Sequence, residues 1–170
     1  EGQHCIPTFV SQKALSEAVG YCQSDMSVER GGVFLGSLYQ DEKGAYVDLK
    51  HFAPAWGAEA TSTSMRFDKT AWESINRCRA TLVNLDVAGW LHSHPFRIQT
   101  ENEDGGVPML SPSTNDIEVQ SLYFPDNYLP CFIIDPLADD LENATAVWKW
   151  SHDGMVMQQN TVLMYGGNDE

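Results

Sequence analysis

The fold of this chain is decided by one stretch, Val87-Ala88-Gly89-Trp90-Leu91-His92-Ser93-His94-Pro95. Its apolar first half is typical of a buried strand at the centre of a sheet. At the polar end of the stretch, His92 and His94 are two positions apart. Successive strand side chains point to opposite faces, so these two imidazoles share one side, with their backbones about 6–7 Å apart. That spacing lets both rings reach one metal ion, because histidine nitrogens bind zinc at about 2.0–2.1 Å.

Helices and further strands are predicted on both sides of this stretch. Apolar residues over Ser11–Cys22 have helical spacing, and Asp68 is expected to cap a second helix. The pattern predicts strands over Gly31–Tyr39 and Ala45–Ala53, joined across the turn Asp41-Glu42-Lys43-Gly44. The other expected elements are a loop over residues 97–112, a helix over Ser113–Tyr123, a strand over Cys131–Ile134 and a hairpin of Ala144–Trp150 with Met155–Gln159.

This order of elements predicts an α/β fold with one mixed central sheet flanked by helices. No linker or internal repeat divides the chain, so we expect a single domain over residues 1–165 and a disordered tail over residues 166–170. In the last hairpin Trp148 and Trp150 alternate with Lys149, and we expect both tryptophans on the buried face.

Composition narrows the class of protein. The chain has 170 residues, 42% of them hydrophobic, which is enough for one good core. Its net charge is −14 and no two basic residues are adjacent, so we expect neither nucleic acid nor an anionic membrane as a partner. No stretch reaches the roughly 18 apolar residues of a spanning helix. The four cysteines form no Cys-x-x-Cys pair, so reduced thiols and a cytoplasmic location are the expectation.

Two more polar segments can complete a site around the histidines. Pro112-Ser113-Thr114-Asn115-Asp116 has a helix-capping pattern, in which Ser113 accepts a backbone N–H and keeps its own O–H to donate. Asp116, in the first turn, can direct its carboxylate toward a cation held by the histidines. Upstream, Glu29 precedes Gly31-Gly32, and the missing side chains let that backbone approach a neighbour closely.

Together these segments resemble the JAMM (MPN-plus, JAB-domain) zinc metalloproteases. The matching motifs are Glu29 with Gly31-Gly32-x-x-x-Gly36, then His92-Ser93-His94-Pro95, then Ser113-x-x-Asp116. The resemblance covers about residues 27–124 and implies an MPN-like domain layered like the cytidine deaminases. It implies Zn²⁺ held by His92, His94 and Asp116, with Glu29 as the general base and Ser113 supporting the oxyanion. The implied activity is hydrolysis of the amide bond after the terminal glycine of ubiquitin or a ubiquitin-like protein.

The chain departs from the family pattern in the longer segment between Pro95 and Ser113. This insertion contains Glu101, Glu103 and Asp104, which we expect to contact a basic substrate tail as it passes the metal. Such exposed charge pairs contribute only about 0–1 kcal/mol. Because a loop can bulge without moving its ends, the insertion concerns substrate preference more than chemistry.

The sequence argues against two other classes of metal-binding protein. A zinc deaminase needs His-x-Glu and Pro-Cys-x-x-Cys, but here Pro130-Cys131 is followed by Phe132-Ile133. A cupin would need a glutamate shortly after the second histidine, where Ile98 and Gln99 stand. Two alternatives stay open. One is a hydrolase that releases a small molecule or amino acid from a sulfur-carrier tail, and the other is a non-catalytic scaffold on the same fold. A partner subunit is possible but not implied.

Overall fold

The structure is a computed structural model and describes residues 6–98, 107–108, 110–151, 154–157 and 162–166. Its helices are α1 (Gln12–Gln23), α2 (Lys69–Ala80) and α3 (Thr114–Tyr123). Its strands are β1 (Thr8–Ser11), β2 (Gly31–Asp41), β3 (Gly44–Pro54), β4 (Asp86–Ser93), β5 (Arg97–Ile98), β6 (Val107–Pro108), β7 (Pro130–Ile134), β8 (Thr145–Ser151), β9 (Gly154–Met157) and β10 (Val162–Tyr165).

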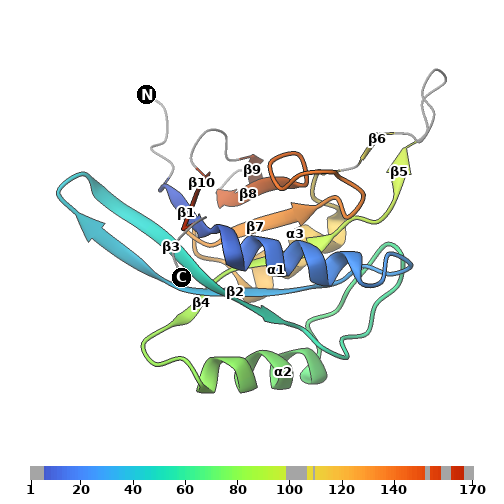
Figure 1. Cartoon of the computed structure of the whole chain (residues 1–170), viewed down its shortest axis with the longest axis horizontal. Coiled ribbons are helices and arrows are strands. Elements are labelled where there is room, and N and C mark those ends of the chain that lie inside the picture. Colours follow the sequence, from blue (N-terminus) through green and yellow to red (C-terminus); the bar gives the residue numbers. More distant parts are fainter. Residues whose placement is uncertain (1–5, 99–106, 109, 152–153, 158–161, 167–170) are drawn as a thin grey trace.

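Within the described residues, eight strands form one mixed sheet in the order β10-β1-β3-β2-β4-β7-β8-β9 (Figure 1). Strand β4 lies inside the sheet, antiparallel to β2 and parallel to β7. Its residues from Ala88 to Ser93 are all buried, as the apolar stretch predicts. The α/β class and the central position of this strand are therefore confirmed.

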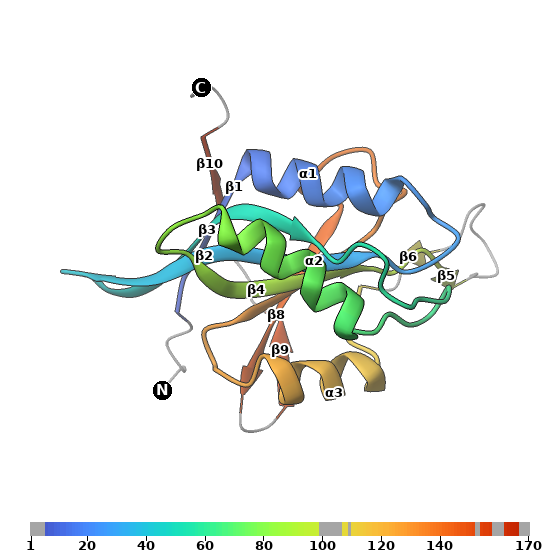
Figure 2. The same ribbon diagram turned by 90° about the horizontal axis from the view of Figure 1, so that it is seen from below.

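The helices cover both faces of the sheet, and Figure 2 shows α1 and α3 on opposite sides of it. One core cluster contains the buried face of α1, and the other contains residues of α2 and α3. In α1 the buried side chains are those that the helical spacing predicts, Ala14, Leu15, Ala18, Val19 and Cys22. Helix α2 begins where expected, because the Asp68 carboxylate accepts the Ala71 N–H at 2.9 Å. None of the described helices is long and apolar enough to cross a membrane.

The glycines of β2 allow this strand to lie close to both neighbours. A Cβ at Gly31 would come within 2.1 Å of the Leu91 carbonyl oxygen on β4, and one at Gly32 within 2.2 Å of the Ala53 oxygen on β3. At Gly36 the corresponding distance to the Asp48 oxygen is 1.9 Å. The close backbone approach that the sequence predicts is thus present, and it brings the start of β2 against the histidine end of β4, where Gly31 pairs with His92.

Two expectations were wrong in part, and two strands were not predicted. The segment 97–112 is not only a loop, because Arg97–Ile98 pairs with Val107–Pro108. Strands β1 and β10 were not predicted, and they pair with each other in parallel. In β8 the tryptophans Trp148 and Trp150 are half-buried, whereas Lys149 between them is buried. The lysine tolerates burial because its Nζ donates a hydrogen bond to the Ile6 carbonyl.

Replacing Gly31 should destabilise the protein strongly. We expect Gly31→Ala to lower the free energy of unfolding by at least about 2 kcal/mol, because the new methyl group collides with a backbone oxygen that cannot move alone. Urea denaturation measures this change. The matched control is Gly20→Ala in α1, where a Cβ meets nothing within 4 Å and alanine should stabilise the helix by about 0.5–1 kcal/mol. Equal stability of Gly31→Ala and the wild type would contradict the close packing.

Candidate metal centre

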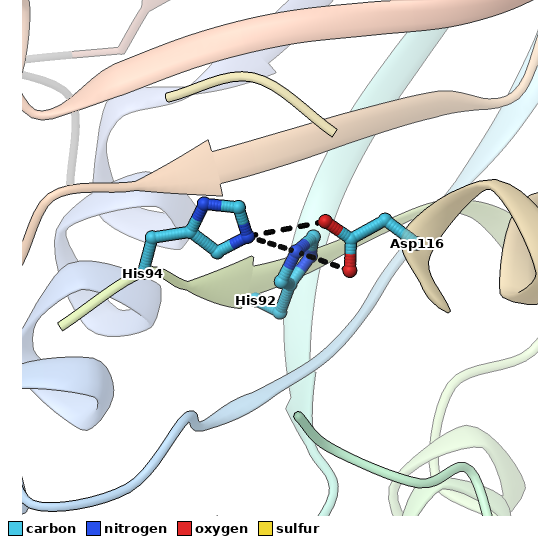
Figure 3. A group of neighbouring side chains, drawn as sticks. All are labelled: His92, His94 and Asp116. Atoms are coloured by element: carbon cyan, nitrogen blue, oxygen red, sulfur yellow. Dashed lines mark hydrogen bonds and ion pairs between the residues drawn. The ribbon is translucent and has the colours of Figure 1, made fainter. Parts of the chain in front are cut away.

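The histidines lie where β4 ends, and α3 begins beside them. His92 is in β4 and His94 follows its last residue, while Asp116 is in the first turn of α3. Figure 3 shows the two imidazole rings and the carboxylate pointing toward one another. The three side chains offer one ligand atom each, all within 4.8 Å of one another, and all three residues are buried. This group can hold a metal ion.

The distances between these groups are short. The Nε2 atoms of His92 and His94 are 2.9 Å apart. The Asp116 carboxylate reaches His92 Nε2 through Oδ1 at 2.9 Å and His94 Nε2 through Oδ2 at 3.1 Å. Two imidazole nitrogens and one carboxylate thus converge on a single point between a strand end and a helix start.

The start of α3 fixes the carboxylate through the predicted capping box. Ser113 Oγ accepts the Asp116 N–H at 3.2 Å, and Asp116 Oδ2 accepts the Ser113 N–H at 2.8 Å. The capping interpretation and the metal-ligand interpretation of this segment are therefore compatible, because one carboxylate serves both. Ser113 itself is half-buried at the edge of the site.

Glu29 lies beside the group although it precedes β2 in a polar segment. Its carboxyl Oε1 is 3.8 Å from His94 Nε2, and the residue is only 2% exposed. The backbone holds it there. The Glu29 N–H donates to the Thr61 carbonyl at 2.7 Å. Ser93, between the two histidines, accepts the Arg30 N–H on its Oγ at 2.9 Å and donates its own N–H to the Arg30 carbonyl at 2.8 Å.

The surroundings push the two carboxyl groups toward opposite protonation states. Burial raises the pKa of Glu29 to about 8, and the negative charge of Asp116 adds to the rise. Burial alone would also raise the pKa of Asp116, but the adjacent His92 and hydrogen bonds from both imidazoles and the Ser113 N–H hold that pKa well below its usual range. Burial lowers the pKa of His92 against the attraction of Asp116, which favours the neutral form of the ring, the form that binds metal ions.

Sequence reasoning did not find the side chains that support the ligands. The Trp90 ring stacks on the His92 ring with centroids 4.7 Å apart, and Phe96 stacks on His94 at 5.0 Å. Behind His92, Cys131 Sγ lies 4.0 Å from Nδ1. The available signal was the alternation of strand residues, which places Trp90 and His92 on the same face of β4.

The structure describes the two ends of the insertion that was predicted to contact the substrate, but not the acidic residues in its middle. Glu101, Glu103 and Asp104 lie outside the described residues, so their proposed contact with a substrate stays a prediction. At the start of the insertion, the Arg97 guanidinium bonds both oxygens of the buried Asp135 carboxylate, at 3.0 and 2.9 Å. Near its end, the Leu110 carbonyl accepts the Trp148 indole N–H at 3.0 Å. Both ends of the insertion are thereby tied to the sheet.

Comparisons with known proteins support the fold and no more. No protein-family model and no curated protein matches the chain. Among solved structures, the solution structure of protein DSY2949 from Desulfitobacterium hafniense is similar, with a TM-score of 0.61 and 16% sequence identity. The match covers 93% of this chain and 92% of that one. At this identity the likeness concerns the fold alone.

The first prediction for this site concerns metal binding. We expect one metal ion per chain, and we expect His92→Ala to lose it, because two of three ligands cannot hold the ion at the same affinity. Metal analysis after dialysis measures the occupancy. His51→Ala is the matched control, since His51 is an exposed histidine on β3, and it should keep the wild-type metal content. Full occupancy in His92→Ala would show that the ion binds elsewhere.

A second prediction concerns the metal-free protein. The folded pKa of Glu29 is about 8, raised from an ordinary 4.5, so between these values unfolding releases its proton and stability falls as pH rises. The penalty that burial places on charged His92 acts below its ordinary pKa of 6.5. Between pH 6.5 and 8 we therefore expect the chelator-treated wild type to lose up to about 1.4 kcal/mol per pH unit through Glu29.

Urea denaturation of the wild type and Glu29→Gln across this range tests the effect. The variant has no carboxyl to titrate, so its stability should depend less on pH. Parallel stability curves for the two proteins would mean that Glu29 is ionised throughout.

Proposed function

We propose that this chain is a zinc-dependent isopeptidase of the JAMM (MPN-plus) type. It hydrolyses the amide bond after the C-terminal glycine of ubiquitin or a ubiquitin-like protein. One observation carries the proposal: a buried carboxyl, Glu29, lies 3.8 Å from an imidazole of a His-His-Asp group. Three protein ligands with a protonatable group beside them is the arrangement of hydrolytic zinc sites rather than structural ones.

The residues present fit zinc. A tetrahedral ion with bonds of about 2.0–2.1 Å has ligand atoms roughly 3.3 Å apart. The separations here are 2.9 Å between the two imidazole nitrogens and 2.9 and 3.1 Å from these to the carboxylate. Small movements would therefore accommodate the ion. Two imidazoles and one carboxylate also suit zinc better than magnesium or calcium, which prefer all-oxygen sites.

The protein's own contribution to the reaction centres on Glu29. Zinc in this site would supply Lewis-acid chemistry, lowering the pKa of water and polarising the amide carbonyl. The Glu29 carboxylate takes a proton from the water whose oxygen attacks the carbonyl carbon. It then gives that proton to the amide nitrogen as the C–N bond breaks, so a free carboxylate and a free amine leave. A pKa near 8 in the metal-free site, which a nearby cation lowers, suits a group that takes and returns one proton.

Ser113 is proposed to steady the carbonyl oxygen. Its Oγ lone pair accepts the Asp116 N–H, which leaves the hydroxyl proton as a donor. A hydrogen bond aimed at the oxygen where negative charge develops is worth most in a buried site. This role places Ser113 at the cap of the same helix that carries Asp116.

A groove next to the ligand helix supports a peptide-like substrate. It has a volume of about 370 Å³ and runs between the segment 65–68 and α3, where it is lined by Asn115, Val119, Leu122 and Tyr123. Leu122 is 70% exposed there. An extended tail in this groove would reach the start of α3, where Asp116 meets the histidines. Apolar side chains of such a tail would pack against Val119 and Leu122 in this lining.

The proposal also includes the MPN type of the fold and a cytoplasmic location. We assign the layering, with α1 on one face of the sheet and α2 and α3 on the other, to the MPN type. The buried free thiols of Cys22 and Cys131 suit a reducing cytoplasm.

The proposal predicts a specific defect in Glu29→Gln. This variant should keep zinc and the fold but lose roughly 10²- to 10⁴-fold in kcat, because an amide cannot move the proton. The assay is cleavage of ubiquitin-like conjugates by the zinc-loaded protein, with zinc content measured on the same sample. Glu17→Gln changes an exposed glutamate of α1 and should cleave like the wild type. Wild-type turnover by Glu29→Gln would mean that another group moves the proton.

A panel of substrates separates the remaining alternatives. It contains ubiquitin-like proteins joined to a lysine side chain, and carrier proteins whose terminal glycine bears a single amino acid. Release from the second group alone would favour the sulfur-carrier hydrolase. No cleavage of any substrate by the zinc-loaded wild type would favour the non-catalytic scaffold.

A further inference from the structure

Gln120 links the helix that carries Asp116 to the strand that carries His92. It lies on α3 one turn after Asp116, and its side chain is completely buried. Its Oε1 accepts the Trp90 indole N–H at 2.5 Å, while its Nε2 donates to the carbonyls of Phe124 at 2.8 Å and Leu129 at 3.1 Å. The amide thus uses its carbonyl and both of its N–H groups.

The Trp90 ring, held by Gln120, in turn restrains the His92 ring. It lies nearly parallel to the His92 ring, with an angle of 10° between the planes, and to the Phe124 ring on its other side, with an angle of 7°. A ring held between two others can tilt little without losing both contacts. Because Gln120 fixes the indole from its edge, the stack sets the plane in which His92 presents Nε2.

Helix α3 is held by these polar contacts as well as by apolar burial. Its buried side chains are Asp116, Val119 and Gln120, so two of the three are polar. Ile117, Leu122 and Tyr123 on the same helix are exposed. Its apolar contacts come from Val119 and from the buried Phe124 just after the helix, and apolar contacts alone leave a helix able to slide or rotate on a sheet. Two hydrogen-bonded contacts one turn apart, Asp116 to His92 and Gln120 to Trp90, prevent both movements.

We propose that Gln120 and Trp90 are positioning residues for the metal site. They hold α3 in register on β4, so that Asp116 meets His92 and His94 in ligand geometry before a metal binds. Such preorganisation raises metal affinity because binding no longer has to order the helix. Supporting groups of this kind typically change metal affinity by about 10- to 100-fold.

The test is zinc affinity of the folded protein, measured by competition with a chromophoric chelator, together with the visible absorption of the Co²⁺-loaded protein. We expect Gln120→Met, which keeps the volume but removes the amide, to bind Zn²⁺ about 10- to 100-fold more weakly and to change the Co²⁺ spectrum. Circular dichroism establishes the temperature at which the variant is fully folded, and affinities are compared there.

A matched control separates positioning from general stability. Ser74 is a buried residue of α2 whose Oγ donates to the Pro54 carbonyl at 2.7 Å and accepts the Trp56 N–H at 3.2 Å. Ser74→Ala therefore also breaks a helix-to-strand contact, away from the ligands. It should lower the unfolding temperature but leave zinc affinity within about twofold of wild type and the Co²⁺ spectrum unchanged.

The second variant acts from the other side of the same hydrogen bond. Trp90→Phe keeps an aromatic ring against His92 but removes the indole N–H, and it should weaken zinc binding similarly. If Gln120→Met does not fold, the zinc affinity of Trp90→Phe tests the proposal instead. Wild-type affinity and spectrum in either folded variant would overturn the proposal, as would an equal loss in Ser74→Ala. A wild type that binds no metal would overturn it together with the metal centre.

Discussion

The Asp116 carboxylate is the contact on which the site depends, because its two oxygens meet three different parts of the chain. Oδ1 contacts His92 of β4, while Oδ2 contacts His94 and accepts the Ser113 N–H of its own helix cap. A carboxylate without such partners would cost several kcal/mol to bury. Here the same partners that offset this cost also form a group that can hold a metal ion. Helix start, strand end and ligand geometry are therefore fixed together.

The opposite side of the site depends on backbone contacts. Glycines in β2 allow its first residues to lie against β4. Ser93 of β4 is joined to the backbone of Arg30, just before β2, by one hydrogen bond of its side chain and one of its N–H group. Glu29 is the next residue out, so it is carried into a buried position beside His94. Its place follows from main-chain geometry and would survive changes to its own side chain.

Features with a local cause were predictable from the sequence. The face of α1, the Asp68 cap, the β2–β3 hairpin and the buried β4 follow from periodicity, turn residues and capping chemistry. Strand alternation and the capping pattern are local rules as well, and they placed His92, His94 and Asp116 where they can converge, but only the resemblance to the JAMM family implied that the three bind one metal ion. Features that depend on partners far away along the chain were not predictable from the sequence. Strand β10 has four residues and exists through its pairing with β1, more than 150 positions away along the chain. Likewise, Lys149 is buried because the Ile6 carbonyl lies within reach.

The burial of Glu29 also depends on distant parts of the chain, and it makes the two carboxyl groups of the site differ in pKa. Asp116 receives hydrogen bonds from two imidazoles and a backbone N–H, whereas the Glu29 carboxyl is 3.8 Å from His94 Nε2, beyond hydrogen-bond distance. Both carboxyl groups are buried, and this difference in partners lowers the pKa of Asp116 while burial and the charge of Asp116 raise the pKa of Glu29 to about 8. A divalent cation between the imidazoles and Asp116 would cancel the repulsion that Asp116 exerts on Glu29. The buried proton would then become easier to release, which joins metal binding to the acid–base chemistry of the proposed function.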